Sequence, residues 1–111
     1  MNETQDIVKP ILAFCHQTGI FCVRRQSGAY IVGNRRVKAS SASQSDLWGI
    51  LKGKRHFECE VKKPGEEPTI EQLQWLTDCA MQGALSFWTT SLDDFIEVIR
   101  SAMPWVQHEI H

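Results

Sequence analysis

The feature that most constrains the fold is the order strand, helix, strand between residues 55 and 90. In RHFECEVK (55–62), apolar and charged side chains alternate, as in a β-strand whose two faces meet different surroundings. A Pro-Gly pair ends this strand, and Thr69 is placed to cap a helix that continues to about Gln82. The apolar run 84–90 predicts a second strand, and a helical crossover makes it parallel to the first.

The rest of the chain fits around this unit. We expect helices over 3–17 and 92–103, and strands over 20–25, 27–33 and 46–51, with a turn at 52–54 joining the last of these to 55–62. Pro10 should kink the first helix or delay its start. The basic, serine-rich stretch 34–45 is expected to be a loop. The order α-β-β-β-β-α-β-α predicts an α/β domain with a mixed sheet flanked by helices.

Two patterns predict which side chains form the core. Alternation along 55–62 sends Phe57, Cys59 and Val61 inward and the intervening charged side chains to the other face. In the helix after Thr69, the expected buried face carries Ile70, Leu73, Leu76 and Ala80.

Length and composition favour one ordinary globular domain. With 111 residues, of which 42% are hydrophobic and 23% charged, the chain can bury one modest core. We assign residues 1–103 to this domain and 104–111 to a C-terminal tail. The polar N-terminus and the absence of a long apolar run favour a cytoplasmic protein. The four cysteines lie in apolar surroundings with no Cys-x-x-Cys pair, so we expect small buried hydrophobic residues in a reducing compartment. Their even number also permits disulfides.

Charge is distributed unevenly along the chain. Residues 24–63 hold ten of the twelve Lys and Arg residues but only three of the thirteen acids. Such asymmetry is typical of a face that meets a polyanion, although solvated loops would give the same count. If that polyanion is DNA, the residues expected to contact its phosphates are Arg24, Arg25, Arg35, Arg36, Lys38 and Lys63.

Three charged residues form a candidate metal site. Asp46 opens one strand of the predicted hairpin, and Glu60 and Lys62 share a face of the other. Two carboxylates with a backbone carbonyl would suit Mg²⁺, which prefers oxygen ligands and retains several waters. A lysine beside such a water could orient it for phosphodiester hydrolysis. Alternating charge on an exposed strand is the simpler interpretation of Glu-x-Lys when the motif stands alone.

Three longer runs extend this pattern: SDLWGIL (45–51), FECEVKKPGEEPTIEQLQWL (57–76) and GALSFWTTSLDDF (83–95). Together they resemble the VRR-NUC domain, a family of the PD-(D/E)xK superfamily of metal-dependent nucleases. Arg24 and Gly28 match a recurrent arginine and glycine of the family, so the resemblance reaches from the first helix to about residue 100. Ser45 stands where the family has proline, and Ser43 where it often has glycine.

The resemblance implies a restriction-endonuclease-like core and specific roles for site residues. Asp46 and Glu60 would bind Mg²⁺ or Mn²⁺ with the carbonyl of Val61, Lys62 would align the attacking water, and Gln72 would lie near the metal or the scissile phosphate. The family's first helix usually adds an acid, for which Glu3 is the better candidate and Asp6 the other. Small stand-alone members are similar to phage-type nucleases that act as homodimers on branched DNA such as four-way junctions, in the cytoplasm of a bacterium or a phage-infected host cell.

Three functions follow as hypotheses. The first is a metal-dependent, structure-selective DNA endonuclease, and the second is a DNA-binding module of the same fold without catalysis. The third is a small α/β interaction domain with a fortuitous charged strand. Glu58 is open to two interpretations, either a carboxylate that supports the metal site or an ion-pair partner for a lysine or arginine of the hairpin.

Overall fold

The computed structural model of the protein describes residues 4–25, 29–32, 35–38 and 44–102, and for 29–32 and 35–38 it describes the backbone alone. The elements are α1 (Gln5–Thr18), β1 (Phe21–Arg24), β2 (Ala29–Val32), β3 (Arg35–Lys38), β4 (Leu47–Leu51), β5 (Arg55–Val61), α2 (Ile70–Met81), β6 (Leu85–Thr89) and α3 (Leu92–Ala102). Glu3 and the tail 104–111 lie outside the described residues.

A four-stranded mixed sheet forms the centre of the molecule, in the order β1-β4-β5-β6. The predicted hairpin is confirmed, because β4 and β5 pair antiparallel with Leu51 opposite Arg55. The predicted parallel pair is confirmed too: β5 and β6 run parallel, with Glu60 in register with Trp88. Over the described residues, the protein is therefore a mixed α/β fold with three helices around a four-stranded mixed sheet.

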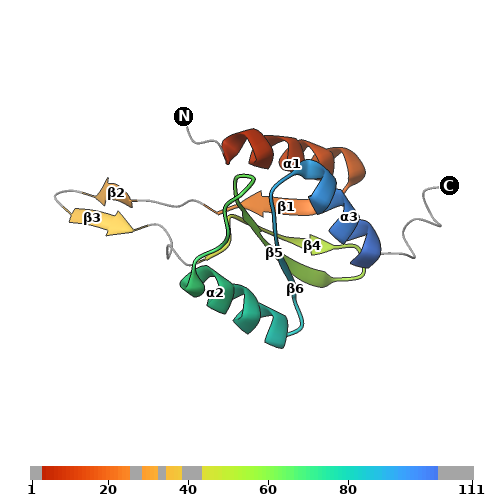
Figure 1. The fold of residues 1–111 in the computed structure, drawn as a ribbon. Coiled ribbons are helices and arrows are strands. Elements are labelled where there is room, and N and C mark those ends of the chain that lie inside the picture. The colour runs from red at the N-terminus through yellow and green to blue at the C-terminus, as the bar shows by residue number, and fades with distance from the viewer. Residues whose placement is uncertain (1–3, 26–28, 33–34, 39–43, 103–111) are drawn as a thin grey trace.

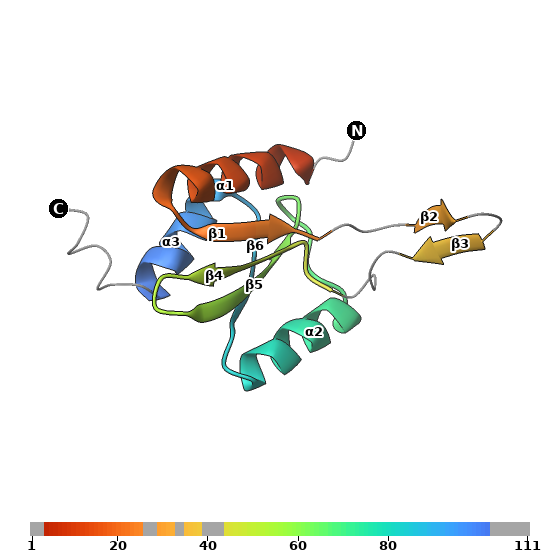
Figure 2. The same ribbon diagram turned by 180° about the vertical axis from the view of Figure 1, so that it is seen from behind.

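The helices divide between the two faces of the sheet. Helices α1 and α3 lie together on one face, and α2 lies on the other (Figures 1 and 2). The hydrophobic core fills the α1–α3 side, where Phe57, Cys59 and Val61 of β5 are all at most 1% exposed, as alternation predicts. Phe57 packs there against Phe95 of α3, with ring centroids 6.1 Å apart.

The first helix continues through its proline. Helix α1 begins at Gln5, so the expectation that Pro10 delays its start is wrong. Pro10 is exposed, whereas Val8, Ile11 and Cys15 form the buried face of the helix.

The predicted loop over 34–45 needs correction. Strand β2 pairs antiparallel with β3, and the two form a separate sheet. Strand β3 lies inside the stretch 34–45 that was expected to be a loop. The physical reason is visible in the sequence, since Gly33-Asn34 separates the two strands and a two-residue Gly-Asn connection favours a β-hairpin.

The buried face of α2 also differs from the prediction. Its inward residues are Gln72, Trp75, Leu76 and Cys79, while Ile70, Leu73 and Ala80 are exposed. Ile70 is 82% exposed and Leu73 44%. The helix is rotated because the sheet face beneath it carries a buried carboxylate that bonds to the indole of Trp75. A prediction of the buried face from hydrophobic residues alone cannot take that polar contact into account.

Two further expectations are buried free thiols and the absence of a membrane span. All four cysteines are free, with Cys15 and Cys59 buried, which agrees with their prediction as small hydrophobic residues. Within the described part of the chain, every helix is too short or too polar to cross a bilayer.

We predict that Gly49→Ala is strongly destabilising. A Cβ at Gly49 would lie 2.1 Å from the carbonyl oxygen of Phe21 and 2.5 Å from the ring of Phe57, so strands β1 and β4 would have to separate. The expected cost is at least about 3 kcal/mol, at the upper end for overpacking. Gly65→Ala is the control: it has no neighbour within 4 Å and meets only the strain of a φ of +90°, which costs about 1–2 kcal/mol. Urea unfolding measures both, and equal losses would contradict this packing.

Candidate metal centre

Asp46 is fixed by the ends of two neighbouring strands. It lies just before β4, and its carboxylate Oδ2 accepts a hydrogen bond of 2.9 Å from the backbone N–H of Val61 on β5. Its own carbonyl accepts a bond of 2.8 Å from the N–H of Arg25, directly after β1. The side chain is therefore held against the end of β5, where Glu60 is the preceding residue.

Glu60 is a buried acid with an incomplete set of partners. It is 3% exposed, and its Oε2 lies 3.6 Å from the ammonium Nζ of Lys62. Its other oxygen, Oε1, is buried and has no hydrogen-bond partner among the described residues. A buried carboxylate oxygen without a partner is costly, which makes it a position suited to a cation or an ordered water.

The pKa values show that the two carboxyl groups interact. Burial raises the pKa of Glu60 to about 7, the negative charge of Asp46 adds to the effect, and the nearby Lys62 opposes it. Burial also raises the pKa of Asp46. The N–H of Val61, the charges of Lys62 and Arg24, and a hydrogen bond with Glu60 lower this pKa but do not cancel the effect of burial. The negative charge of Asp46 thus disfavours the ionised form of the buried Glu60, and a divalent cation between the two carboxyl groups would offset this repulsion.

These residues fit a small divalent cation. Asp46 and Glu60 supply hard oxygen donors, and Oε1 of Glu60, which no described residue bonds, is available to the cation. In the part of the chain that the structure describes, no group of three or more His, Cys, Asp or Glu side chains is arranged to hold a metal. Asp6, exposed in the first turn of α1, therefore does not complete an acidic triad. The remaining ligands would have to be a backbone carbonyl, for which Val61 was predicted, and waters.

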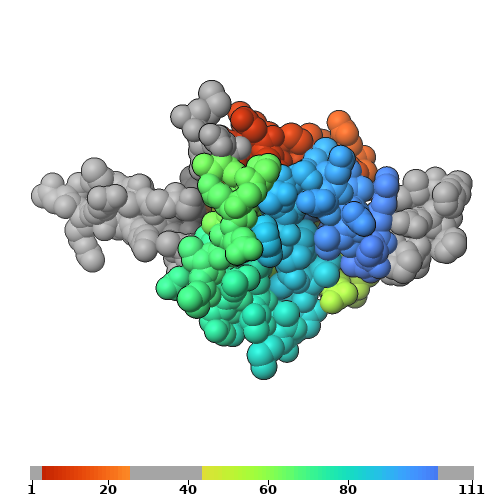
Figure 3. Space-filling view, in the orientation of Figure 1, coloured from red at the N-terminus to blue at the C-terminus, as the bar shows by residue number. Residues whose placement is uncertain are grey.

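The first turns of α1 are nevertheless close to this end of the sheet. The segment that follows β5 lies beside the beginning of α1 in both ribbon views and in the space-filling view (Figures 1, 2 and 3). The expectation that the N-terminal helix contributes to the site concerned Glu3, which lies outside the described residues.

Glu58, on the same face of β5 as Glu60, is the centre of a buried polar network. It is 1% exposed, and its carboxylate forms a two-point ion pair with the guanidinium of Arg25, at 2.6 and 3.1 Å. Ser45 Oγ donates to Oε1 at 2.5 Å, and Trp75 Nε1 donates to the same oxygen at 3.0 Å. The ring of His56 contacts Oε2. Although burial alone would raise the pKa of Glu58, the hydrogen bonds from Arg25 and these other partners lower it to about 2.

The network corrects two interpretations. Glu58 and Glu60 are buried, so β5 is not an ordinary solvated surface strand. The ion-pair partner of Glu58 is Arg25 rather than a cation of the hairpin turn. The guanidinium of Arg25 also donates to Ser45 and lies 5.4 Å from the centre of the Trp75 ring, so its donors are directed inside the protein.

The sequence patterns missed the roles of His56 and Trp75. A signal for His56 existed, because it continues the two-residue period of Glu58, Glu60 and Lys62 along one strand face. Trp75 lies three positions after Gln72, but its indole bond to a strand carboxylate has no local sequence signal.

Gln72 has a structural role in the helix. Its side-chain Oε1 accepts from the backbone N–H of Thr69 at 2.9 Å, and Thr69 Oγ1 accepts from the N–H of Gln72 at 3.1 Å. This reciprocal pair is a capping box, and it confirms Thr69 as the N-cap. The structure thus places Gln72 at the start of α2, with its amide oxygen used by the helix itself.

The other predicted DNA contacts are distributed as follows. Arg24 is exposed at the end of β1 and close enough to Asp46 to affect its pKa. Lys63 follows the site and pairs with Glu66 at 3.1 Å. Arg35, Arg36 and Lys38 belong to β3, whose side chains lie outside the described structure.

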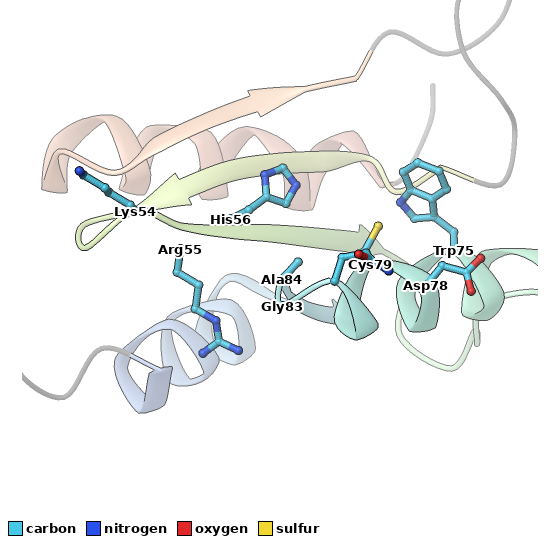
Figure 4. A pocket seen from close by; sticks show the side chains of 9 residues that line it. Lys54, Arg55, His56, Trp75, Asp78, Cys79, Gly83 and Ala84 are labelled. Carbon is cyan, nitrogen blue, oxygen red and sulfur yellow. The ribbon is translucent and has the colours of Figure 1, made fainter.

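A separate cavity of about 620 Å³ lies between α2 and the beginning of β5. Figure 4 shows His56 and Trp75 among its lining residues, with Cys79 nearby on α2. Neither Asp46 nor Glu60 lines it. The cavity is therefore distinct from the carboxylate pair, at the other end of β5.

Comparison with models of known protein families found no match, and comparison with curated proteins found none either. The resemblance to the VRR-NUC domain therefore remains a hypothesis based on residues of this chain.

We predict that Gln72→Ala lowers stability through the helix cap. Loss of the side-chain acceptor leaves the N–H of Thr69 without its partner, at an expected cost of about 0.3–1.5 kcal/mol. Gln72→Glu keeps an acceptor at the same position and should stay close to wild type. Thermal and urea unfolding compare the two variants. An alanine variant as stable as the glutamate variant would contradict the capping role.

Proposed function

We propose that the protein is a metal-dependent endodeoxyribonuclease with a restriction-endonuclease-like core, which hydrolyses phosphodiester bonds using Mg²⁺ or Mn²⁺. The observation that carries the proposal is the half-buried Asp46 beside the buried Glu60, whose Oε1 has no hydrogen-bond partner among the described residues, with the ammonium of Lys62 close by. An interaction domain with a fortuitous charged strand gives no reason to bury Glu60 beside a second carboxylate and leave its Oε1 without a partner among the described residues.

Each residue has a defined part in the proposed reaction. The carboxylates of Asp46 and Glu60 would hold the cation, with the Val61 carbonyl as a further oxygen donor. The bound cation would supply positive charge that acidifies water and stabilises the phosphorane-like charge of the transition state. Lys62, whose side chain is 16% exposed, would hold the attacking water in place and donate to the phosphate as negative charge develops.

Positive charge near the pair supports an anionic substrate. Arg24 is exposed and close to Asp46, and Lys63 follows Lys62 directly. Ten of the twelve basic residues belong to the segment 24–63 that also contains the carboxylate pair. A phosphodiester backbone approaching Asp46 would therefore meet cations on both β1 and the end of β5.

We further propose that the enzyme acts as a homodimer on branched DNA. A four-way junction presents strands of opposite polarity, and a two-fold dimer would place one carboxylate pair on each of two strands. One protomer of 111 residues with one such pair would cut a single strand per encounter.

The cleavage experiment uses a labelled four-way junction, a flap, a duplex and a single strand, with Mg²⁺, Mn²⁺ or EDTA. We predict metal-dependent cleavage, with the junction cut fastest. Asp46→Asn, Glu60→Gln and Lys62→Ala should each lower the rate at least about 100-fold while DNA binding persists, because they remove charge at the reacting centre. Glu97→Gln and Lys9→Ala, exposed on α3 and α1, are the matched controls and should cut normally.

The outcome separates the hypotheses. Binding without cleavage in any metal would favour a DNA-binding module without catalysis. A folded protein that neither binds nor cuts would favour an interaction domain. Full activity of Asp46→Asn or Glu60→Gln would refute the metal assignment.

A salt titration tests the role of Arg24. If Arg24 contacts one phosphate, Arg24→Gln should reduce the slope of log affinity against log salt concentration by about 0.9 on duplex arms. Lys9→Gln changes the same charge on an exposed position of α1 and should leave the slope unchanged. Fluorescence anisotropy at several salt concentrations gives both slopes. Equal slopes for all three proteins would remove Arg24 from the interface.

A further inference from the structure

The Glu58 network joins four separate parts of the chain at one buried carboxylate. Its partners are Arg25 after β1, Ser45 before β4, His56 on β5 and Trp75 on α2. All of them converge on the sheet face that also carries Glu60. The sequence distances from Glu58 range from two residues to 33.

Stability alone does not explain why such a network is buried. Taking a carboxylate and a guanidinium out of water costs several kcal/mol, and well-packed apolar residues often replace a buried ion pair at no loss. What the network supplies instead is a fixed geometry. The planar guanidinium of Arg25 donates to both oxygens of Glu58, and only one relative orientation of the two side chains allows both hydrogen bonds.

The geometry that is fixed includes the backbone of Asp46. Ser45 precedes Asp46 and is held from two sides: its Oγ donates to Glu58, and Arg25 donates to its carbonyl at 3.2 Å and its Oγ at 3.0 Å. The N–H of Arg25 then bonds to the carbonyl of Asp46. These bonds fix the backbone at Ser45 and Asp46, and so fix the point from which the Asp46 carboxylate reaches the N–H of Val61 beside Glu60.

We propose that Glu58 is a positioning residue of the metal centre, which through Ser45 and Arg25 holds the Asp46 carboxylate in place beside Glu60. The inference rests on the proposed function. It assigns Glu58 no contact with metal or DNA. Supporting residues of this kind typically change metal affinity 10–100-fold when they are altered.

The test measures Mn²⁺ affinity directly, by the electron paramagnetic resonance signal of free Mn²⁺ in the absence of DNA. Glu58→Gln keeps the shape of the side chain but removes the charge that orients Arg25. We expect its Kd for Mn²⁺ to rise about 10–100-fold. Glu97→Gln, an exposed acid on α3, is the control and should bind Mn²⁺ as wild type does.

A second pair of variants covers the case in which Glu58→Gln does not fold. Ser45→Ala and Trp75→Phe each remove one donor to Glu58 Oε1, so each should lower the urea midpoint of unfolding to a similar extent. Only Ser45 is adjacent to Asp46. The positioning role therefore predicts at least about fivefold weaker Mn²⁺ binding for Ser45→Ala and a change of less than about twofold for Trp75→Phe.

The results distinguish this inference from the proposed function. If wild type binds no Mn²⁺, the metal centre itself is wrong and the inference falls with it. If wild type binds Mn²⁺ and Asp46→Asn abolishes binding, but Glu58→Gln or Ser45→Ala binds normally, only the positioning role is overturned. Equal weakening by Ser45→Ala and Trp75→Phe would also overturn it, because a general loss of stability would then account for both.

Discussion

The hydrogen bond from the Val61 N–H to the Asp46 carboxylate connects the beginning of β4 to the end of β5, and the candidate site depends on it. The hairpin brings the two strands into register, with Leu47 opposite Cys59, so Asp46 continues this ladder toward Glu60. The parallel strand β6 then covers the other side of β5, and the N–H of Lys62 bonds to the carbonyl of Thr89 at 2.9 Å. Three strand ends therefore fix where the two acids and the lysine lie.

The two faces of β5 show how the fold separates stability from chemistry. On the α1–α3 side, Phe57 and its neighbours build an apolar core with Phe95. On the α2 side, the buried residues of β5 are acids, and their surroundings shift their pKa values in opposite directions. Glu58 is surrounded by donors that lower its pKa to about 2, whereas burial and a neighbouring carboxyl raise the pKa of Glu60 to about 7. One strand face thus holds a fully bonded carboxylate next to one whose Oε1 has no hydrogen-bond partner among the described residues, and these opposite pKa shifts support the proposed site.

Local and periodic signals predicted much of this structure. The two-residue alternation of β5, the cap at Thr69 and the strand–helix–strand order gave correct elements and a correct parallel pair. The rotation of α2 was not predictable from hydrophobicity, because its inward Trp75 serves a polar contact 17 residues away. The second hairpin, β2 with β3, was missed because the basic residues of β3 outweighed the Gly33-Asn34 turn signal. In the site, strand periodicity correctly predicted that Glu60 lies beside Lys62. The ion pair between Arg25 and Glu58 could not be predicted, because it joins residues 33 positions apart.

The most direct test of the account is the position of Mn²⁺ in a crystal of the wild-type protein, located by its anomalous scattering. We predict one strong peak between Asp46 and Glu60, with oxygens of both carboxylates about 2.1 Å away, the distance expected for a small divalent cation. A peak elsewhere, or carboxylates of Asp46 and Glu60 directed apart with no ion between them, would contradict the proposed metal centre.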